Sequence, residues 1–89
     1  MKAIVSVFSK DRIGIIADVC AVLAKMRVNV LDLSQTIMDG LFTMVMLVDT
    51  GTSDLSFGEI QESLAKNGEA LGLNIRIQRE DIFDAMHQV

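Results

Sequence analysis

A chain of 89 residues has room for a single domain, and its one cysteine, Cys20, allows neither an internal disulfide nor a cysteine-based metal cluster. The net charge of −4 and the lack of tryptophan and tyrosine argue against nucleic acid as a partner, because phosphate binding needs clustered Lys and Arg and single strands need aromatic side chains to stack on. No apolar run approaches the roughly 20 residues of a membrane-spanning helix, and Met1-Lys2 leads directly into a strand pattern instead of a signal peptide, so we expect a cytoplasmic protein without a membrane partner.

The first 26 residues predict a strand and a helix that are joined by a polar turn. Residues 2–9 have the strand pattern, and apolar side chains then recur at helical spacing, which predicts a helix over residues 13–26 with Cys20 on its apolar side. In the turn, Asp11 has the chemistry of an N-cap that accepts a hydrogen bond from the N–H of Ile13 or Gly14. Gly14 has no Cβ, so a ligand or a neighbouring backbone can approach it closely.

The rest of the chain predicts three more strands and a second helix. Apolar side chains change parity near Val30-Leu31, which predicts a bulge, and Asp39-Gly40 predicts a tight hairpin turn. Ser56 and Glu59 have the spacing of a capping box at the start of a helix. The predicted elements are strands over 28–38, 41–49 and 73–79, a helix between Ser56 and Gly72, and a short amphipathic tail over 82–89.

The order βαββαβ predicts an α+β fold, a ferredoxin-like sandwich in which a four-stranded antiparallel sheet carries both helices on one face. Residues 1–89 then form a single domain. The strand over 41–49 is apolar on both faces, whereas the helices can cover only one of them. Ile82, Phe83 and Met86 of the tail could cover part of the other face. Because an exposed apolar patch normally marks an interface, we expect a homo-oligomer.

The junction between the first strand and the first helix is the candidate binding site. The first N–H groups of a helix lack partners within the helix, so they form a ready site for a carboxylate or a similar anion. The carboxylate of Asp11 would suit an amine in the same place. The alternative is an ordinary strand-to-helix turn in which Asp11 only caps the helix and nothing is bound.

The sequence contains no convincing catalytic or metal site. The single histidine, His87, is close to the C-terminus without a nucleophile placed by spacing, and Ser6 and Ser9 lack a nearby base. We expect Asp18 and Asp32 to have separate positions, on a helix surface and in a strand. These patterns predict that the protein is not an enzyme and holds no metal.

The strand that runs into Asp11-Arg12-Ile13-Gly14-Ile15, followed by the step Arg27-Val28-Asn29-Val30 into the second strand, resembles the ACT domain, a small ligand-binding regulatory module. The resemblance covers nearly all 89 residues, including Leu33-Ser34-Gln35-Thr36 and the segment Ile82-Phe83-Asp84-Ala85-Met86. It is greatest to small stand-alone bacterial ACT-domain proteins. It implies a non-enzymatic regulatory module without a cofactor, which senses an amino acid or a similar metabolite at a subunit interface and acts through a protein partner or through its own assembly.

In amino-acid-binding ACT domains the site uses the glycine loop and a polar residue that opens the second strand. The resemblance places Asn29 in that second role, where its amide can bind either a carboxylate or an ammonium group. Asp11 stands where serine-binding members carry an amide, Ser9 where they carry a histidine and Ile13 where proline is frequent, which argues against serine as the ligand. The alternative is a protein-interaction or structural homo-oligomer without a functional ligand site. The expected ligand-binding residues are Ser9, Asp11, Arg12, Ile13, Gly14, Ile15 and Asn29.

Overall fold

The computed structural model describes residues 1–81, so the expected tail over 82–89 lies outside the described residues. All six predicted elements are present within one or two residues of their expected ends. In chain order they are β1 (Lys2–Lys10), α1 (Ile15–Lys25), β2 (Asn29–Met38), β3 (Leu41–Asp49), α2 (Phe57–Leu71) and β4 (Asn74–Arg79). The predicted βαββαβ order is therefore confirmed. Neither described helix has the length and apolar character that crossing a membrane requires.

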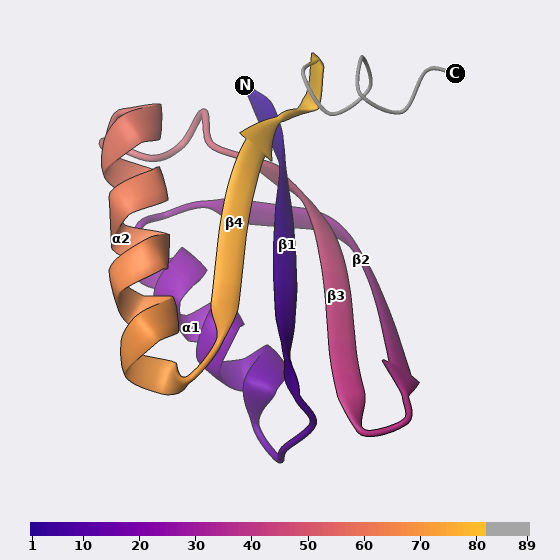
Figure 1. The fold of residues 1–89 in the computed structure, drawn as a ribbon. Helices are drawn as coiled ribbons and strands as arrows, with labels where there is room; N and C mark the ends of the chain where they lie inside the picture. Colours follow the sequence, from indigo (N-terminus) through magenta and orange to yellow (C-terminus); the bar gives the residue numbers. More distant parts are fainter. Residues whose placement is uncertain (82–89) are drawn as a thin grey trace.

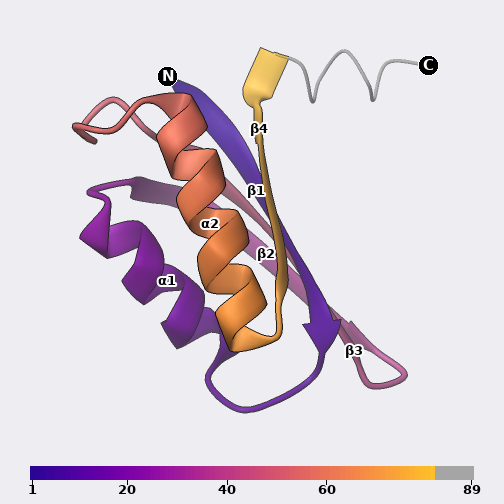
Figure 2. The same ribbon diagram turned by 60° about the vertical axis from the view of Figure 1, so that its left-hand side comes forward.

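The four strands form one antiparallel sheet in the order β2-β3-β1-β4 (Figure 1). Both helices lie on the same side of this sheet, as predicted (Figure 2). We call the helix-covered side the inner face and the opposite side the outer face. Because β1 and β2 are both antiparallel to β3, they run in the same direction and begin at the same end of the sheet.

The hydrophobic core fills the space between the inner face and the helices. Alternate residues of the strands point inward, and the helices add the apolar side chains that recur at helical spacing. The fully buried side chains at the centre are Val5, Val7, Ile15, Val19, Leu23, Met44, Met46, Val48, Ile60 and Leu64. Cys20, which was predicted on the apolar side of the first helix, is a free, half-buried thiol packed against this core. Full burial of such side chains contributes about 1.5–3 kcal/mol each.

The bulge, the β2–β3 hairpin and the cap of α2 follow the sequence signals closely. The register of β2 against β3 shifts between Val30 and Asp32, which confirms the bulge. Asp39 and Gly40 both have positive φ, 52° and 76°, as the predicted two-residue hairpin requires. The capping box is formed in both directions, with Ser56 accepting from the N–H of Glu59 and the Glu59 carboxylate accepting from the N–H of Ser56. These local signals place the start of α2 and the β2–β3 hairpin.

The far end of β2 is left uncovered on the inner face. Gln35 is exposed and Ile37 is 56% exposed, although both share the inward parity of the half-buried Leu33. The neighbouring Phe42 of β3 is buried. An uncovered strip of β2 therefore lies beside the loop that joins β1 to α1.

Candidate functional site

The loop between β1 and α1 turns the chain back under the sheet. The N–H of Asp11 donates to the carbonyl oxygen of Gly40 at 2.9 Å, which fixes the loop to the β2–β3 hairpin. Gly14 has φ 89° and is the N-cap of α1, and no side chain caps this helix. A Cβ at Gly14 would meet only Arg12 Nη1, at 3.9 Å, so glycine is needed there for its left-handed backbone and not for lack of space.

The expectation that Asp11 caps α1 is therefore wrong. The helix begins at Ile15, two residues later than predicted, because the left-handed Gly14 makes the turn into the helix. Asp11 lies three residues before the cap, and its side chain is exposed. The first N–H groups of α1 are consequently left without a capping side chain, and the carboxylate of Asp11 is not used as a cap.

Arg12 holds the loop in place. Its guanidinium donates to the carbonyl oxygens of Ile13 at 3.0 Å and Leu71 at 3.2 Å, and its Nη2 lies 3.1 Å from a carboxylate oxygen of Asp18. These contacts connect the loop to the first turn of α1 and to the last turn of α2. An exposed ion pair contributes at most about 1 kcal/mol. The main effect of the three contacts is thus to fix the position of the loop.

A hollow of about 200 Å³ lies between this loop, the first turn of α1 and the uncovered strip of β2. Its size suits a small metabolite, since pockets for drug-sized ligands measure roughly 300–1,000 Å³. Polar groups come from the loop and from Gln35, and apolar surface comes from Ile37 and Phe42. The lining residues are Asp11, Arg12, Gly14, Ile15, Ile16, Ala17, Gln35, Ile37 and Phe42.

Four of the seven expected site residues line this hollow, namely Asp11, Arg12, Gly14 and Ile15. Ser9 does not line it, and its hydroxyl donates to the carbonyl oxygen of Lys10 at 2.9 Å. Ile13 points away at the tip of the loop, with 98% of its surface exposed. Gln35 and Ile37 were not predicted. The signal for both was their inward parity with Leu33 after the bulge.

Asn29 is far from the loop within one chain. It opens β2 opposite Asp49 at the end where β1 begins, whereas the loop follows the end of β1. Ile37 is eight positions after Asn29 along β2, which is about 26 Å at the rise of a strand. Asn29 borders a different surface hollow, with Ala24, Arg27, Val28 and Thr52. The expected convergence of Asp11 and Asn29 therefore does not occur inside one copy of the chain.

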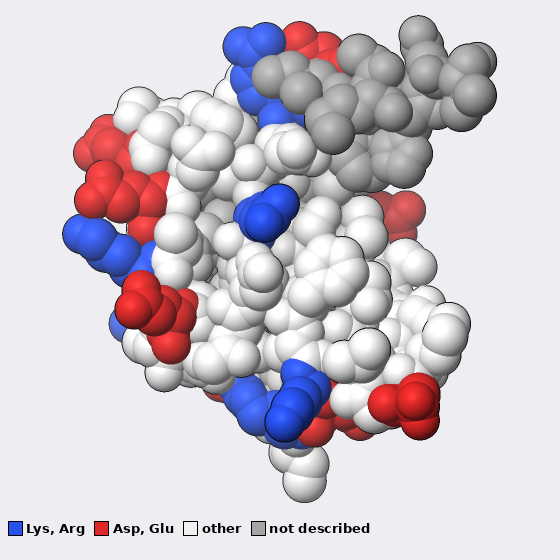
Figure 3. Space-filling model, viewed as in Figure 1, with Lys and Arg blue, Asp and Glu red and all other residues white. Residues whose placement is uncertain are grey.

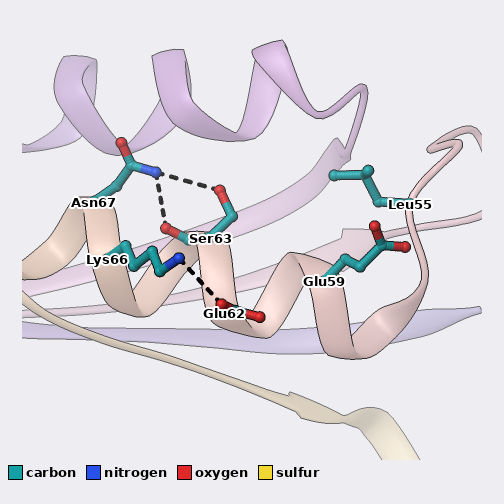
Figure 4. A pocket seen from close by; sticks show the side chains of 6 residues that line it. All are labelled: Leu55, Glu59, Glu62, Ser63, Lys66 and Asn67. Atoms are coloured by element: carbon teal, nitrogen blue, oxygen red, sulfur yellow. Dashed lines mark hydrogen bonds and ion pairs between the residues drawn. The ribbon is translucent and has the colours of Figure 1, made fainter.

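In another hollow, on the surface of α2, most of the polar side chains are paired with a neighbour (Figure 4). The amide of Asn67 donates to the carbonyl oxygen and the hydroxyl of Ser63 at 2.8 and 3.2 Å, and Lys66 pairs with Glu62 at 3.1 Å. The remaining carboxylate, Glu59, belongs to the capping box, and the hydrogen bonds from Ser56 lower its pKa. Most of these polar groups are already engaged within α2 and its cap, so this surface has the character of a helix exterior.

The other lowered pKa belongs to Asp49, at the opposite end of the sheet from the loop. The N–H of Gly51 donates to this carboxylate at 2.8 Å, and the N-terminal ammonium lies 3.4 Å away; both lower its pKa. Within residues 1–81, no group of three or more His, Cys, Asp or Glu side chains is placed to hold a metal ion. The loop hollow is thus the candidate functional site.

Comparison with known proteins agrees with this fold. A family model described as the ACT domain matches residues 2–78. A UPF0237 protein of Clostridium acetobutylicum is 49% identical over 89 residues, covering 100% of both chains. The structure of an ACT domain protein from Streptococcus pneumoniae has a TM-score of 0.83 at 37% identity and covers 98% of each chain. The regulatory subunit of aspartate kinase from Thermus thermophilus shares the fold, with a TM-score of 0.66 at 20% identity over 86% of this chain and 50% of that one.

Proposed function

Because this chain belongs to the ACT domain family, whose members are regulatory modules that often bind amino acids, we propose that it is a non-enzymatic sensor of a free amino acid or a similar small metabolite. The observation that carries the proposal is the hollow beside the β1–α1 loop. It combines an uncapped helix N-terminus with a free carboxylate, an amide and an apolar wall. The carboxylate of a free amino acid would match the helix N-terminus, its ammonium group the carboxylate or the amide, and its side chain the apolar wall.

The start of α1 suits the carboxylate of the ligand. No side chain accepts from its first N–H groups, and Ile15, Ile16 and Ala17 all border the hollow. The partial positive charge at a helix N-terminus stabilises an anion by about 0.3–1 kcal/mol, and a hydrogen bond to a charged group contributes about 1.5–3 kcal/mol. This end of the hollow would therefore orient the ligand.

Asp11 and Gln35 suit the ammonium group. Asp11 is exposed, borders the hollow and does not cap the helix, so its carboxylate remains available to a cation. The Gln35 amide can both donate and accept, so it would suit either end of the ligand. Ile37 and Phe42 give an apolar wall for the ligand's own side chain. The position of Arg12, held by three contacts, keeps the loop in the geometry that this arrangement needs.

Pairing with a second copy of the chain would bring the end of β2 that carries Asn29 close to the same site. β2 is an edge strand of ten residues without lysine or proline, the residues that usually protect an edge from pairing. If two β2 strands pair antiparallel, the Asn29 end of one lies beside the Ile37–Met38 end of the other. Asn29 of the second copy then approaches the loop of the first. Such pairing would favour a site that lies at the interface between subunits, and the sensor would pass on its state by contact with a protein partner or by its assembly.

The proposal is tested by thermal unfolding of the full chain with each of the 20 amino acids and with their deaminated analogues. An amino acid at 100 times its dissociation constant should stabilise the fold by about 2.7 kcal/mol, which raises the melting temperature of a domain this size by roughly 10–20 °C. The matching analogue without the amine should stabilise it less. No shift with any of these compounds would contradict the proposal and favour the alternative, a homo-oligomer without a ligand site.

A further inference from the structure

The outer face of the sheet is largely uncharged and uncovered in the described part of the chain. Figure 3 looks onto this face and shows acidic and basic side chains mainly around its rim, with one basic group near its middle. Phe8 is 52%, Leu41 60% and Val45 37% exposed, and Ile4 and Leu47 are half-buried beside them. Soluble monomers rarely leave a contiguous apolar patch of this kind open. The face therefore has the character of an interface.

Apart from Lys2, Lys10 and Asp49 at the strand ends, two opposite charges stand on this face, one on each edge strand. Arg76 is on β4 and Asp32 is on β2. Within residues 1–81 neither side chain has an ion-pair partner, and the one hydrogen bond of Asp32 is accepted from the N–H of its neighbour Leu33. We infer that the outer face packs against the outer face of a second copy, and that Arg76 of each copy pairs with Asp32 of the other.

The strand register supports this arrangement. Arg76 shares a cross-strand row with Ser6 and Val45, and Asp32 lies in the next row with Leu47 and Ile4. A twofold axis that runs parallel to the strands between the two sheets keeps each row at its height and exchanges left and right. It places β4 over β2 of the second copy and β1 over β3. Arg76 and Asp32 then differ by one row, about 7 Å, across sheets packed about 10 Å apart, which an arginine side chain can span.

The same axis matches the apolar side chains. It places Ile4 against Leu47, Phe8 against Thr43 and Val45 against Ser6 of the other copy, because each pair shares a row. A twofold axis in the same plane but perpendicular to the strands would place β4 over β4 and bring Arg76 close to its own copy. Like charges that face each other disfavour that arrangement. The charges thus select one of the two orientations.

The area is sufficient for a specific but modest contact. Four strands at about 4.8 Å spacing and roughly 25 Å of strand length give about 500 Å² per copy, and the pair covers about 1,000 Å². This lies at the low end of specific interfaces. The contact is also distinct from pairing of the β2 edges, in which Arg76 and Asp32 of different copies are far apart. If both surfaces were used at once, the copies would assemble into an open-ended filament. The test therefore follows the effect of the Arg76–Asp32 pair on association and not the size of the assembly.

The test uses two single variants of the full chain, Arg76→Glu and Asp32→Arg, studied by sedimentation velocity. Each variant alone places two like-charge pairs in the contact, so we expect the association constant to fall about tenfold or more. In an equimolar mixture the two variants restore opposite charges at both positions, and the average mass should return toward that of the parent. Lys66→Glu and Glu69→Arg carry the same charge changes on the surface of α2 and should leave association unchanged.

Asp32→Asn provides a second variant that retains the acceptor for the N–H of Leu33 and removes only the charge. It should weaken association less than Asp32→Arg does. Circular dichroism of every variant checks that the fold is intact. The inference is overturned if the single variants associate like the parent, which would mean that the face is covered within one chain or not at all. It is equally overturned if the mixture fails to recover.

Discussion

Replacement of Gly68 by alanine should destabilise the protein, although alanine is the better helix former by about 1 kcal/mol. Gly68 is buried in α2 where the helix crosses the start of β4. An added Cβ would lie 2.7 Å from the carbonyl oxygen of Leu73 and 3.1 Å from Cγ1 of Ile75. The Leu73 oxygen is backbone, and the N–H of the same residue donates to the carbonyl oxygen of Gly68 at 2.7 Å, so this segment has little freedom to move away.

Overpacking of this kind costs about 1–3 kcal/mol, and a contact of 2.7 Å with a backbone oxygen belongs to the upper part of that range, above the gain of about 1 kcal/mol in helix propensity. We expect a net loss of about 1–2 kcal/mol, or roughly 5–15 °C in melting temperature for a domain of this size. A shift of this helix turn should also disturb the candidate site, because Arg12 of the loop donates to the carbonyl oxygen of Leu71 in the same turn.

Gly58→Ala is the matched control. Gly58 lies in the first turn of α2, and a Cβ there would meet nothing within 4 Å. This variant should be as stable as the parent or more stable, by up to about 1 kcal/mol. Thermal and urea unfolding of both variants give the comparison. If Gly68→Ala is also as stable as the parent, close packing of α2 on β4 is not the reason for this glycine.

Further variants test the loop and the capping box. Gly14→Val should cost about 1–2 kcal/mol or somewhat more in urea unfolding, because φ is 89° there, and should abolish ligand binding; Gly14→Asn should cost less. Asp11→Asn should leave stability nearly unchanged, since Asp11 is no cap. In calorimetric titration it should weaken the binding of amine-bearing ligands about tenfold or more, and Glu69→Gln is the control. Hydrogen bonds from Ser56 lower the pKa of Glu59, so its stabilisation is complete above about pH 4.3 and is lost as the pH falls through the lower pKa of the folded state. The melting temperature of Glu59→Gln should therefore fall less between neutral and acidic pH than the melting temperature of the parent.

The fold could be predicted from local signals because each one has a direct physical cause. The capping box at Ser56, the Asp39-Gly40 turn and the parity change near Val30 were all confirmed where the sequence placed them. The start of α1 was predicted two residues early. Asp11 and Gly14 are both good residues for the cap position, and only the left-handed φ of Gly14 decides between them.

The site was predicted only in part because its residues come from different elements. The loop residues are contiguous in sequence, and so four of them could be identified. Gln35 and Ile37 join them because the bulge turns them toward the inner face and the helices leave that end of β2 uncovered, which local sequence signals do not reveal. Asn29 was placed in the same pocket by resemblance, whereas parallel β1 and β2 put it at the opposite end within one chain.

The most direct test of the proposed sensor is backbone and side-chain amide mapping by NMR during titration with the amino acid that stabilises the fold most. The account predicts that the largest shifts occur at the N–H groups of Ile15, Ile16 and Ala17 and at the side-chain amide of Gln35. Shifts confined to the α2 surface around Ser63 and Asn67, or no shifts at any concentration of any amino acid, would contradict it.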